Sequence, residues 1–321
     1  MMRIIGPDYL VFGVDDVAAC TQYLTDFGLT PVGVDDKGGL FEACDGTGVI
    51  IRHRNDPSLP PALPTANMLR QQVYGVESAA DLDAIATELG SDRRVTRLAD
   101  GGLETVDDQG FSLRFQVTVR RKIDMPAEKI NAPGAPAGRA PNELGVYPDM
   151  PALPRSLSHV VLFVPDIAEA TAFYCGRLGF VITDELVGAG PFLRPKANDD
   201  HHTLFFIRTP DYMKGCEHIA FHMGGPTELM VAGTRFARKG YQSFWGPGRH
   251  KFGSNWFWYF NSPMGVHVEF DADMDKHDDS WVARQAPISP EASQMFLFEW
   301  RQRWAPTGGP GGATEAEGTR E

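Results

Sequence analysis

The sequence lacks the features that would place it outside ordinary globular proteins. Its 321 residues hold four scattered cysteines without a CxxC pair, which excludes a disulfide scaffold and predicts reduced thiols in a cytoplasmic protein. No apolar run approaches the roughly 18 residues of a membrane span, and no secretory signal is visible. Acidic residues outnumber basic ones, giving a net charge of −12. We therefore expect neither membrane nor nucleic-acid partners, because phosphate binding needs a concentrated basic surface.

Proline, which is spread thinly elsewhere, is concentrated in one stretch of the chain. Residues 122–154 contain 7 of the 24 prolines, a density that blocks both helix interiors and sheet ladders. This pattern predicts a linker between an N-terminal module, residues 1–121, and a C-terminal module, residues 155–304. The apolar spacing over Phe296–Trp304 predicts an amphipathic helix at the end of the second module. Residues 305–321 are of low complexity, and we expect them to be disordered.

The two flanks of the linker resemble each other. Each has an apolar run, an aspartate suited to cap a helix, a helical pattern and a glycine at the helix end: Tyr9–Val14, Asp16 and Gly28 in the first, His159–Val164, Asp166 and Gly179 in the second. Later segments match as well, from Gln72 against His218 and from Arg114 against Glu269. The sequence therefore predicts an α+β fold in which tandem βαβββ units form two barrel-like modules.

Histidine is nearly absent from the first half, where only His53 precedes His159. Three strand-like segments of the second half present His159, His218 and Glu269. Two neutral imidazoles and one carboxylate on one face of a metal, with open positions opposite, are the ligands of non-haem Fe(II) oxygen chemistry. Glu269 also stands between two apolar residues, where a carboxylate needs a partner to offset its desolvation. We therefore predict a metal site formed by these three residues.

The first module does not carry this ligand set. The aligned positions hold Tyr9 (or Asp8, if the register slips by one residue), Gln72 and Arg114. A guanidinium at the third position would repel a cation, so we expect the first module to be a non-catalytic scaffold.

Other polar residues of the second module favour structural roles. His222 lies four residues beyond His218, and His267 lies two residues before Glu269, each on the same strand face as that ligand, and we expect both to be exposed or hydrogen-bonded. Asp271 and Asp273 follow a predicted strand, where solvated side chains are the expectation.

The stretch ending at Glu269 resembles the signature of the type I extradiol ring-cleavage dioxygenases of the vicinal oxygen chelate superfamily. Their histidine, tyrosine, Pro-x-Gly and glutamate correspond here to His250, Tyr259, Pro263-Met-Gly265 and Glu269. Trp258 and Ser262 differ from the residues usual in that signature. These departures leave the predicted ligands untouched and bear on the substrate class.

The resemblance implies an Fe(II) cofactor, for which Mn(II) could substitute on the same ligands, and an aromatic diol and O2 as substrates. It assigns a general acid role to His202, with His201 as the alternative on the opposite strand face. It also implies that His250 and Tyr259 hydrogen-bond the substrate oxygen. The implied reaction opens the ring beside the diol and incorporates both oxygen atoms.

Two other functions remain open at this point. One is a dioxygenase of the same superfamily that acts on a trihydroxybenzene or a hydroquinone. The other is a non-enzymatic protein that binds an aromatic compound or a metal with the same fold. We also expect a homo-oligomer, because exposed sheet edges favour assembly.

Overall fold

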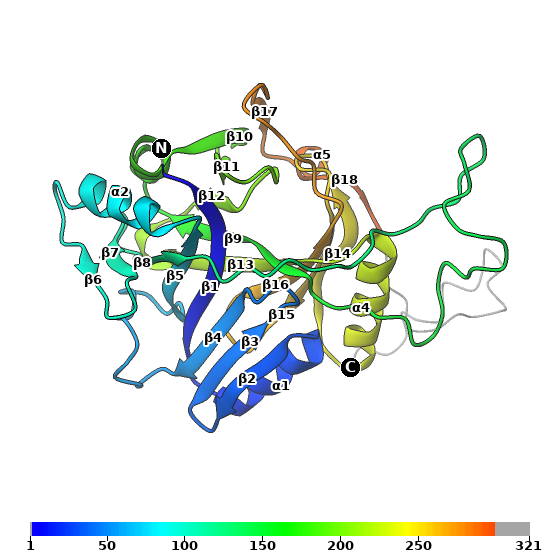
Figure 1. The fold of residues 1–321 in the computed structure, drawn as a ribbon, viewed down its shortest axis with the longest axis horizontal. Helices are drawn as coiled ribbons and strands as arrows, with labels where there is room; N and C mark the ends of the chain where they lie inside the picture. The colour runs from blue at the N-terminus through cyan, green and yellow to red at the C-terminus, as the bar shows by residue number, and fades with distance from the viewer. Residues whose placement is uncertain (1, 299–321) are drawn as a thin grey trace, which may run out of the picture.

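The computed structural model describes residues 2–298, which form two consecutive modules of strands and short helices (Figure 1). The elements of the first module are β1 (Ile4–Val14), α1 (Val17–Phe27), β2 (Thr30–Asp35), β3 (Gly38–Glu42), β4 (Gly48–His53), β5 (Leu69–Val76), α2 (Ala79–Leu89), β6 (Thr96–Arg97), β7 (Leu103–Val106) and β8 (Ser112–Val117).

The second module repeats this order and then extends it. Its elements are β9 (Ser156–Val164), α3 (Ile167–Thr171), the π-helical turn η1 (Ala172–Arg177), β10 (Phe180–Val187), β11 (Gly190–Pro195), β12 (Leu204–Arg208), the 3₁₀ turn η2 (Asp211–Met213), β13 (Gly215–His222), α4 (Pro226–Arg238), β14 (Ser243–His250), β15 (Trp256–Asn261), β16 (His267–Ala272), β17 (Arg284–Pro287), α5 (Pro290–Ser293) and β18 (Gln294–Leu297).

The predicted helix signals form as expected at the start of each module. Asp16 caps α1 by accepting a hydrogen bond from the Ala19 amide, and Asp166 caps α3 through the Glu169 amide, both at 2.9 Å. Gly28 ends α1 in the left-handed region, at φ 108°, where a side chain would be strained.

The strand orders confirm the predicted α+β tandem duplication. The first sheet runs β2-β3-β4-β1-β5-β8-β7-β6, and the second runs β10-β11-β12-β9-β13-β16-β15-β14, with β17 and β18 added at its two edges. Each sheet therefore joins two βαβββ units at its centre, through β1 and β5 in the first module and β9 and β13 in the second.

The two modules share one hydrophobic core cluster of buried residues. At their contact, Phe27 at the end of α1 stacks on Phe270 of β16, with ring centroids 3.8 Å apart and planes 1° from parallel. Apolar packing between α1 and β16 thus fixes the position of the first module against the second sheet.

Residues 118–155, which include the predicted linker, contain neither helix nor strand. The segment loops away from the sheets beside α4 (Figure 1), and the Arg235 side chain donates to the carbonyls of Met150 and Pro148 at 2.9 and 2.7 Å. All four cysteines are free. Between residues 2 and 298, no helix combines the length and the apolar character needed to cross a bilayer.

The alignment of the first module is wrong by one residue at one of the three ligand positions. Val161 pairs with His218, and the corresponding Val11 pairs with Gln71. Gln71, and not Gln72, therefore occupies the place of His218. The positions of His159 and Glu269 keep the predicted Tyr9 and Arg114.

The predicted C-terminal helix is wrong where the structure describes it. Phe296 and Leu297 belong to β18, which pairs with β14 at the edge of the second sheet. Extended pairing satisfies backbone groups of β14 that would otherwise be unpaired. Trp300–Trp304, and the predicted disordered tail of residues 305–321, lie outside the described residues.

Candidate metal centre and catalytic pocket

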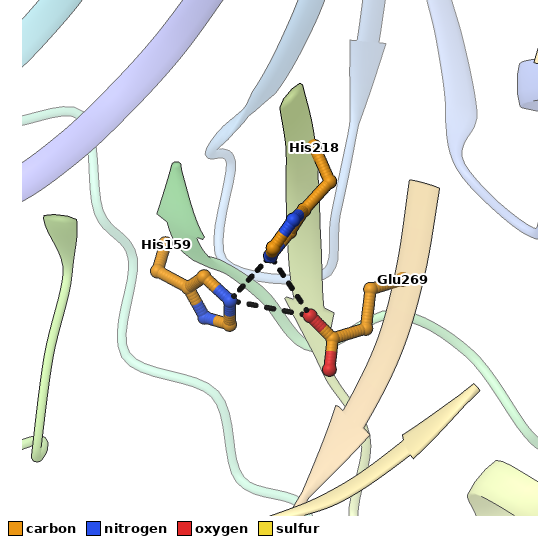
Figure 2. A group of neighbouring side chains, drawn as sticks. All are labelled: His159, His218 and Glu269. Atoms are coloured by element: carbon orange, nitrogen blue, oxygen red, sulfur yellow. Dashed lines mark hydrogen bonds and ion pairs between the residues drawn. The ribbon is translucent and has the colours of Figure 1, made fainter. Parts of the chain in front are cut away.

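The three predicted metal ligands meet at one point. Figure 2 shows His159 from β9, His218 from β13 and Glu269 from β16 facing one another. His159 Nε2 lies 3.2 Å from His218 Nε2 and 3.2 Å from Glu269 Oε2, and His218 Nε2 lies 3.4 Å from the same oxygen. Within the described chain, this is the group of histidine and acidic side chains that could hold a metal ion.

The strand register explains this convergence. Ala220 pairs with His159 on one side and with Glu269 on the other. His218 lies two residues before Ala220 in β13. Side chains two residues apart in a strand point to the same face, so His218 faces the same side of the sheet as His159 and Glu269. Residues separated by more than 100 positions thus contribute to one site.

The triangle of ligand atoms fits a divalent ion bound on one face. Two ligand atoms at right angles about an ion, each about 2.1 Å from it, lie about 3 Å apart. All three side chains are buried, at 2%, 6% and 0% exposure, and neither oxygen of Glu269 has a hydrogen-bond partner of normal geometry within residues 2–298. When both imidazoles are neutral and carry no proton on Nε2, the lone pairs of these two nitrogens and of Glu269 Oε2 converge. A shared cation stabilises them, as in a two-histidine, one-carboxylate site.

The hydrogen bonds behind the imidazoles leave both Nε2 atoms free for a metal. The Ser158 hydroxyl donates to Asp271 at 2.7 Å, so its oxygen accepts from His159 Nδ1 at 2.9 Å. His218 Nδ1 contacts the carboxylate of Glu217. A proton on each Nδ1 leaves a lone pair on each Nε2, which is the form that binds a metal.

Ser158, Glu217 and Asp271, which support the two imidazoles, were not predicted from the sequence. The expectation that Asp271 is solvated is wrong, because its side chain is 0% exposed and contacts His222 Nδ1 at 2.5 Å. Its place in β16, two residues beyond Glu269 on the same face, was the available signal. Asp273 is exposed and pairs with Arg249 at 2.7 Å.

Without metal, His159 holds a proton more tightly than an ordinary histidine. Burial disfavours the charged imidazole, but the neighbouring carboxylates of Asp271 and Glu269 stabilise it more strongly and raise the pKa of His159 to about 9. Ligation requires the neutral ring. A metal ion must therefore displace this proton at neutral pH.

We predict that metal uptake at pH 7.5 releases about one proton per ion. Metal affinity should rise with pH until pH 9 is passed. Calorimetric titration of the metal-free protein in two buffers of different ionisation enthalpy measures this release. Asp271→Asn, which removes a negative charge beside His159, should reduce it. Identical heats in both buffers at pH 7.5 would contradict the assignment.

A small apolar cavity of about 240 Å³ opens onto the triad. Among the residues that the structure describes, no lysine or arginine lines it. Its walls are mainly aliphatic and aromatic, formed by Val161, Leu186, Phe192, Phe205, Ile207, Phe244, Trp245, Phe252 and Ala292. The polar side chains in the lining are those of His159, His202, Glu217, His218, His250, Tyr259 and Ser293. The cavity therefore combines a few polar side chains with an otherwise apolar lining.

His202, rather than His201, lines this cavity. Its ring centroid lies 4.2 Å from that of His159. His201 is fully buried behind it, with Nε2 2.8 Å from the Asp184 carboxylate and Nδ1 2.9 Å from His202 Nδ1. Arg284 in turn donates to Asp184 from its backbone amide at 2.8 Å.

This chain of contacts determines where His202 carries its proton. His201 Nε2–H donates to the carboxylate, so neutral His201 offers a bare Nδ1. His202 Nδ1–H then donates to that atom, leaving the lone pair on His202 Nε2. Burial and the neighbouring histidines hold the pKa of His202 well below its ordinary value. The ring is therefore neutral at pH 7 and can accept a proton at Nε2.

His250 and Tyr259 also line the cavity. His250 Nε2 lies 3.1 Å from the Tyr259 hydroxyl, and His250 Nδ1 donates to the Ser293 carbonyl at 2.8 Å. Burial, together with the negative charge of Glu269, raises the pKa of Tyr259 well above its ordinary value. Tyr259 is therefore a neutral hydrogen-bond donor at physiological pH.

The remaining histidines of the predicted strands make hydrogen bonds away from the triad atoms. His222 contacts Asp271, and His267 Nδ1 lies 2.7 Å from Glu217 Oε1. Trp258 is buried in the hydrophobic core, and Trp256 is half-buried and packs against this core.

The chain is similar in sequence to known proteins of one superfamily. A model of the Glyoxalase/Bleomycin resistance protein/Dioxygenase superfamily matches residues 156–270. Metapyrocatechase 2 of Cupriavidus necator is 33% identical over 150 residues, which cover 46% of this chain and 45% of that relative. Biphenyl-2,3-diol 1,2-dioxygenase of Paraburkholderia xenovorans is 28% identical over 293 residues, covering 88% of this chain and 92% of that protein.

Solved structures share the two-module fold. The Mn(II)-bound glyoxalase from Novosphingobium aromaticivorans has a TM-score of 0.72 at 23% identity, covering 92% of this chain and 91% of its own. A halotolerant catechol dioxygenase has a TM-score of 0.68 at 15% identity, covering 93% and 95%.

The duplicated sheets have the two-domain vicinal oxygen chelate fold that is seen in structures of extradiol dioxygenases. Residues 156–270 thus match the Glyoxalase/Bleomycin resistance protein/Dioxygenase superfamily, and the relatives similar in sequence to this chain include extradiol dioxygenases.

Proposed function

We propose that this protein is an extradiol dioxygenase that cleaves a catechol-type ring with O2 at an Fe(II) ion held by His159, His218 and Glu269. The observation that carries this proposal is the triangle of two imidazole nitrogens and one carboxylate oxygen beside an apolar cavity, which His159 and His218 line. The same ligands suit Mn(II), which the structurally similar glyoxalase contains. A redox-active ion distinguishes oxygen chemistry from isomerisation.

When bound, such an ion supplies an electron path between the diol and O2, and it eases loss of a hydroxyl proton. The protein residues position the substrate and move protons. The Tyr259 hydroxyl donates to one substrate oxygen, which frees His250 Nε2 to accept a proton from that side. His202 Nε2, bare in its neutral form, accepts a second proton and returns it as a general acid. The apolar wall excludes water that would compete for these contacts.

The cavity chemistry favours a diol whose ring substituents are uncharged and apolar. A carboxylate substituent would be buried without a counter-ion from residues 2–298, because none of the lysines or arginines in that range lines the cavity and burying an unpaired charge is costly. Glu217 adds a negative charge to the same lining. A trihydroxybenzene or a hydroquinone would satisfy the same polar groups and remains the alternative substrate class.

A diol screen tests the proposed reaction. With Fe(II) supplied under air, uncharged catechols should consume one O2 per ring opened and form a coloured ring-opened semialdehyde acid. We expect kcat/KM for these catechols to exceed that for carboxylated catechols by about 100-fold or more. An oxygen electrode and visible absorbance give both quantities. Stoichiometric iron without O2 uptake on any diol or triol would instead favour the non-enzymatic binding protein.

We further propose a cytoplasmic homo-oligomer that has no nucleic-acid or membrane partner. The free cysteines support a reducing compartment. Strand β18, with exposed Met295 and Leu297, is the last strand of the second sheet within residues 2–298, and such an edge supports assembly. Light scattering of the purified protein measures the oligomeric state.

A further inference from the structure

Glu217 occupies a β-bulge directly before the metal ligand His218. Cys216 pairs with Leu162 and His218 pairs with the adjacent Val161, so Glu217 is the extra residue of β13. Consecutive side chains in a regular strand point to opposite faces. The bulge re-aims one of them, and the Glu217 carboxylate thereby reaches the Nδ1 atom of its own neighbour, His218.

The first module contains the same bulge with the opposite charge. There the pairing passes from Phe12–Leu69 to Val11–Gln71, and Arg70 is the extra residue. Arg70 donates to backbone carbonyls of the loop between β4 and β5, at Pro60 and Arg54. A carboxylate thus fills the bulge in the module with three metal ligands, and a cation fills it in the module without them.

A second contact fixes Glu217 in this place. Its Oε1 atom lies 2.7 Å from His267 Nδ1, and the His267 ring stacks on Phe244 with centroids 3.7 Å apart. The Glu217 side chain is 16% exposed and lines both the catalytic cavity and a separate cleft next to Asn67. His267 therefore holds one carboxylate oxygen while the other contacts His218.

We propose that Glu217 is a positioning residue that acts through His218, and that His267 holds it in place, to set how strongly this site retains its metal. The inference rests on the metal site of the proposed function and extends it. The carboxylate fixes the proton of His218 on Nδ1, and its negative charge makes Nε2 a stronger donor to a cation. Such partners of ligating histidines typically change metal affinity by about 10- to 100-fold.

The test compares metal dissociation constants of purified, metal-free variants without any substrate. Competition with a chelator under anaerobic conditions, at one fixed pH, gives the constant for Fe(II) and for Mn(II). Glu217→Gln preserves the shape and removes the charge, and it should weaken both metals by about 10- to 100-fold. His267→Gln, which removes the imidazole that holds Glu217, should weaken them by a smaller factor. Glu185→Gln, at an exposed carboxylate paired with Gln285, is the matched control and should change nothing.

A readout of the ion itself separates this role from a merely structural one. Loss of the negative charge should raise the midpoint potential of bound iron, because it disfavours the more highly charged state. Thermal unfolding of the metal-free variants should match that of the parent. Glu217→Gln and His267→Gln proteins that both hold metal within twofold of the parent would overturn the inference and leave the dioxygenase proposal standing. A parent protein that binds neither metal would overturn both, and activity loss at unchanged metal affinity would overturn only the inference.

Discussion

Replacing His218 by alanine is expected to abolish retention of the metal and, with it, O2 consumption. The substitution removes one of three ligand atoms that lie 3.2–3.4 Å apart, and a single remaining imidazole and carboxylate cannot define the facial site. The apparent affinity should fall by more than about 100-fold, beyond the effect of changing a residue behind a ligand. The same loss is expected for His159→Ala and Glu269→Ala. Metal analysis after anaerobic gel filtration measures it.

The first module provides the matched control for this prediction. Gln71→Ala removes the side chain that occupies the place of His218 in the duplicated sheet, and the protein should keep its full metal content. Gln72→Ala should keep it as well. Full iron occupancy in all three triad variants would refute the ligand assignment.

The ligands could be predicted because strand alternation and residue type carry the information locally. His159, His218 and Glu269 each interrupt an apolar strand, where a buried polar group needs a partner. The duplicated order of elements was visible for a similar reason, since apolar runs, capping aspartates and terminal glycines recur in both halves. These signals depend on a few neighbouring residues.

The parts that could not be predicted depend on pairing between strands. The bulges at Arg70 and Glu217 are register irregularities, and no local pattern marks them, so Gln72 was chosen where Gln71 stands. Phe296, Phe298 and Trp300 fit an alternating strand as well as a helix, and short apolar runs do not distinguish the two. The partner strand β14 decided the outcome. Burial of Asp271 likewise follows from contacts with Ser158 and His222, more than 45 positions away.

Replacing His202 by phenylalanine is expected to lower kcat by about 10²- to 10⁴-fold, the usual contribution of a general acid or base. Phenylalanine keeps the ring that packs beside His159 and Phe192 and removes the Nε2 atom that moves the proton. Metal content should stay unchanged, because His202 is not one of the three converging ligands. O2 uptake at saturating diol, combined with metal analysis, separates the two effects.

The pH dependence gives this prediction a sign. The pKa of His202 is depressed, so the neutral base persists below the ordinary histidine value of about 6.5. In the parent protein, kcat/KM should therefore fall only when the pH drops below that value, and His202→Phe should lose this acidic limb.

His277→Phe is the control for the loss of an imidazole, because His277 stacks on Trp281 and is absent from the cavity lining. If His202→Phe and His277→Phe both kept kcat within a few-fold of the parent, proton transfer would have to be assigned to His250 and Tyr259 alone. His201→Phe tests the relay from Asp184. His201→Phe should lower kcat less than His202→Phe does, because His202 Nε2 is still present. Only the hydrogen bond that keeps the proton of His202 on Nδ1 is lost.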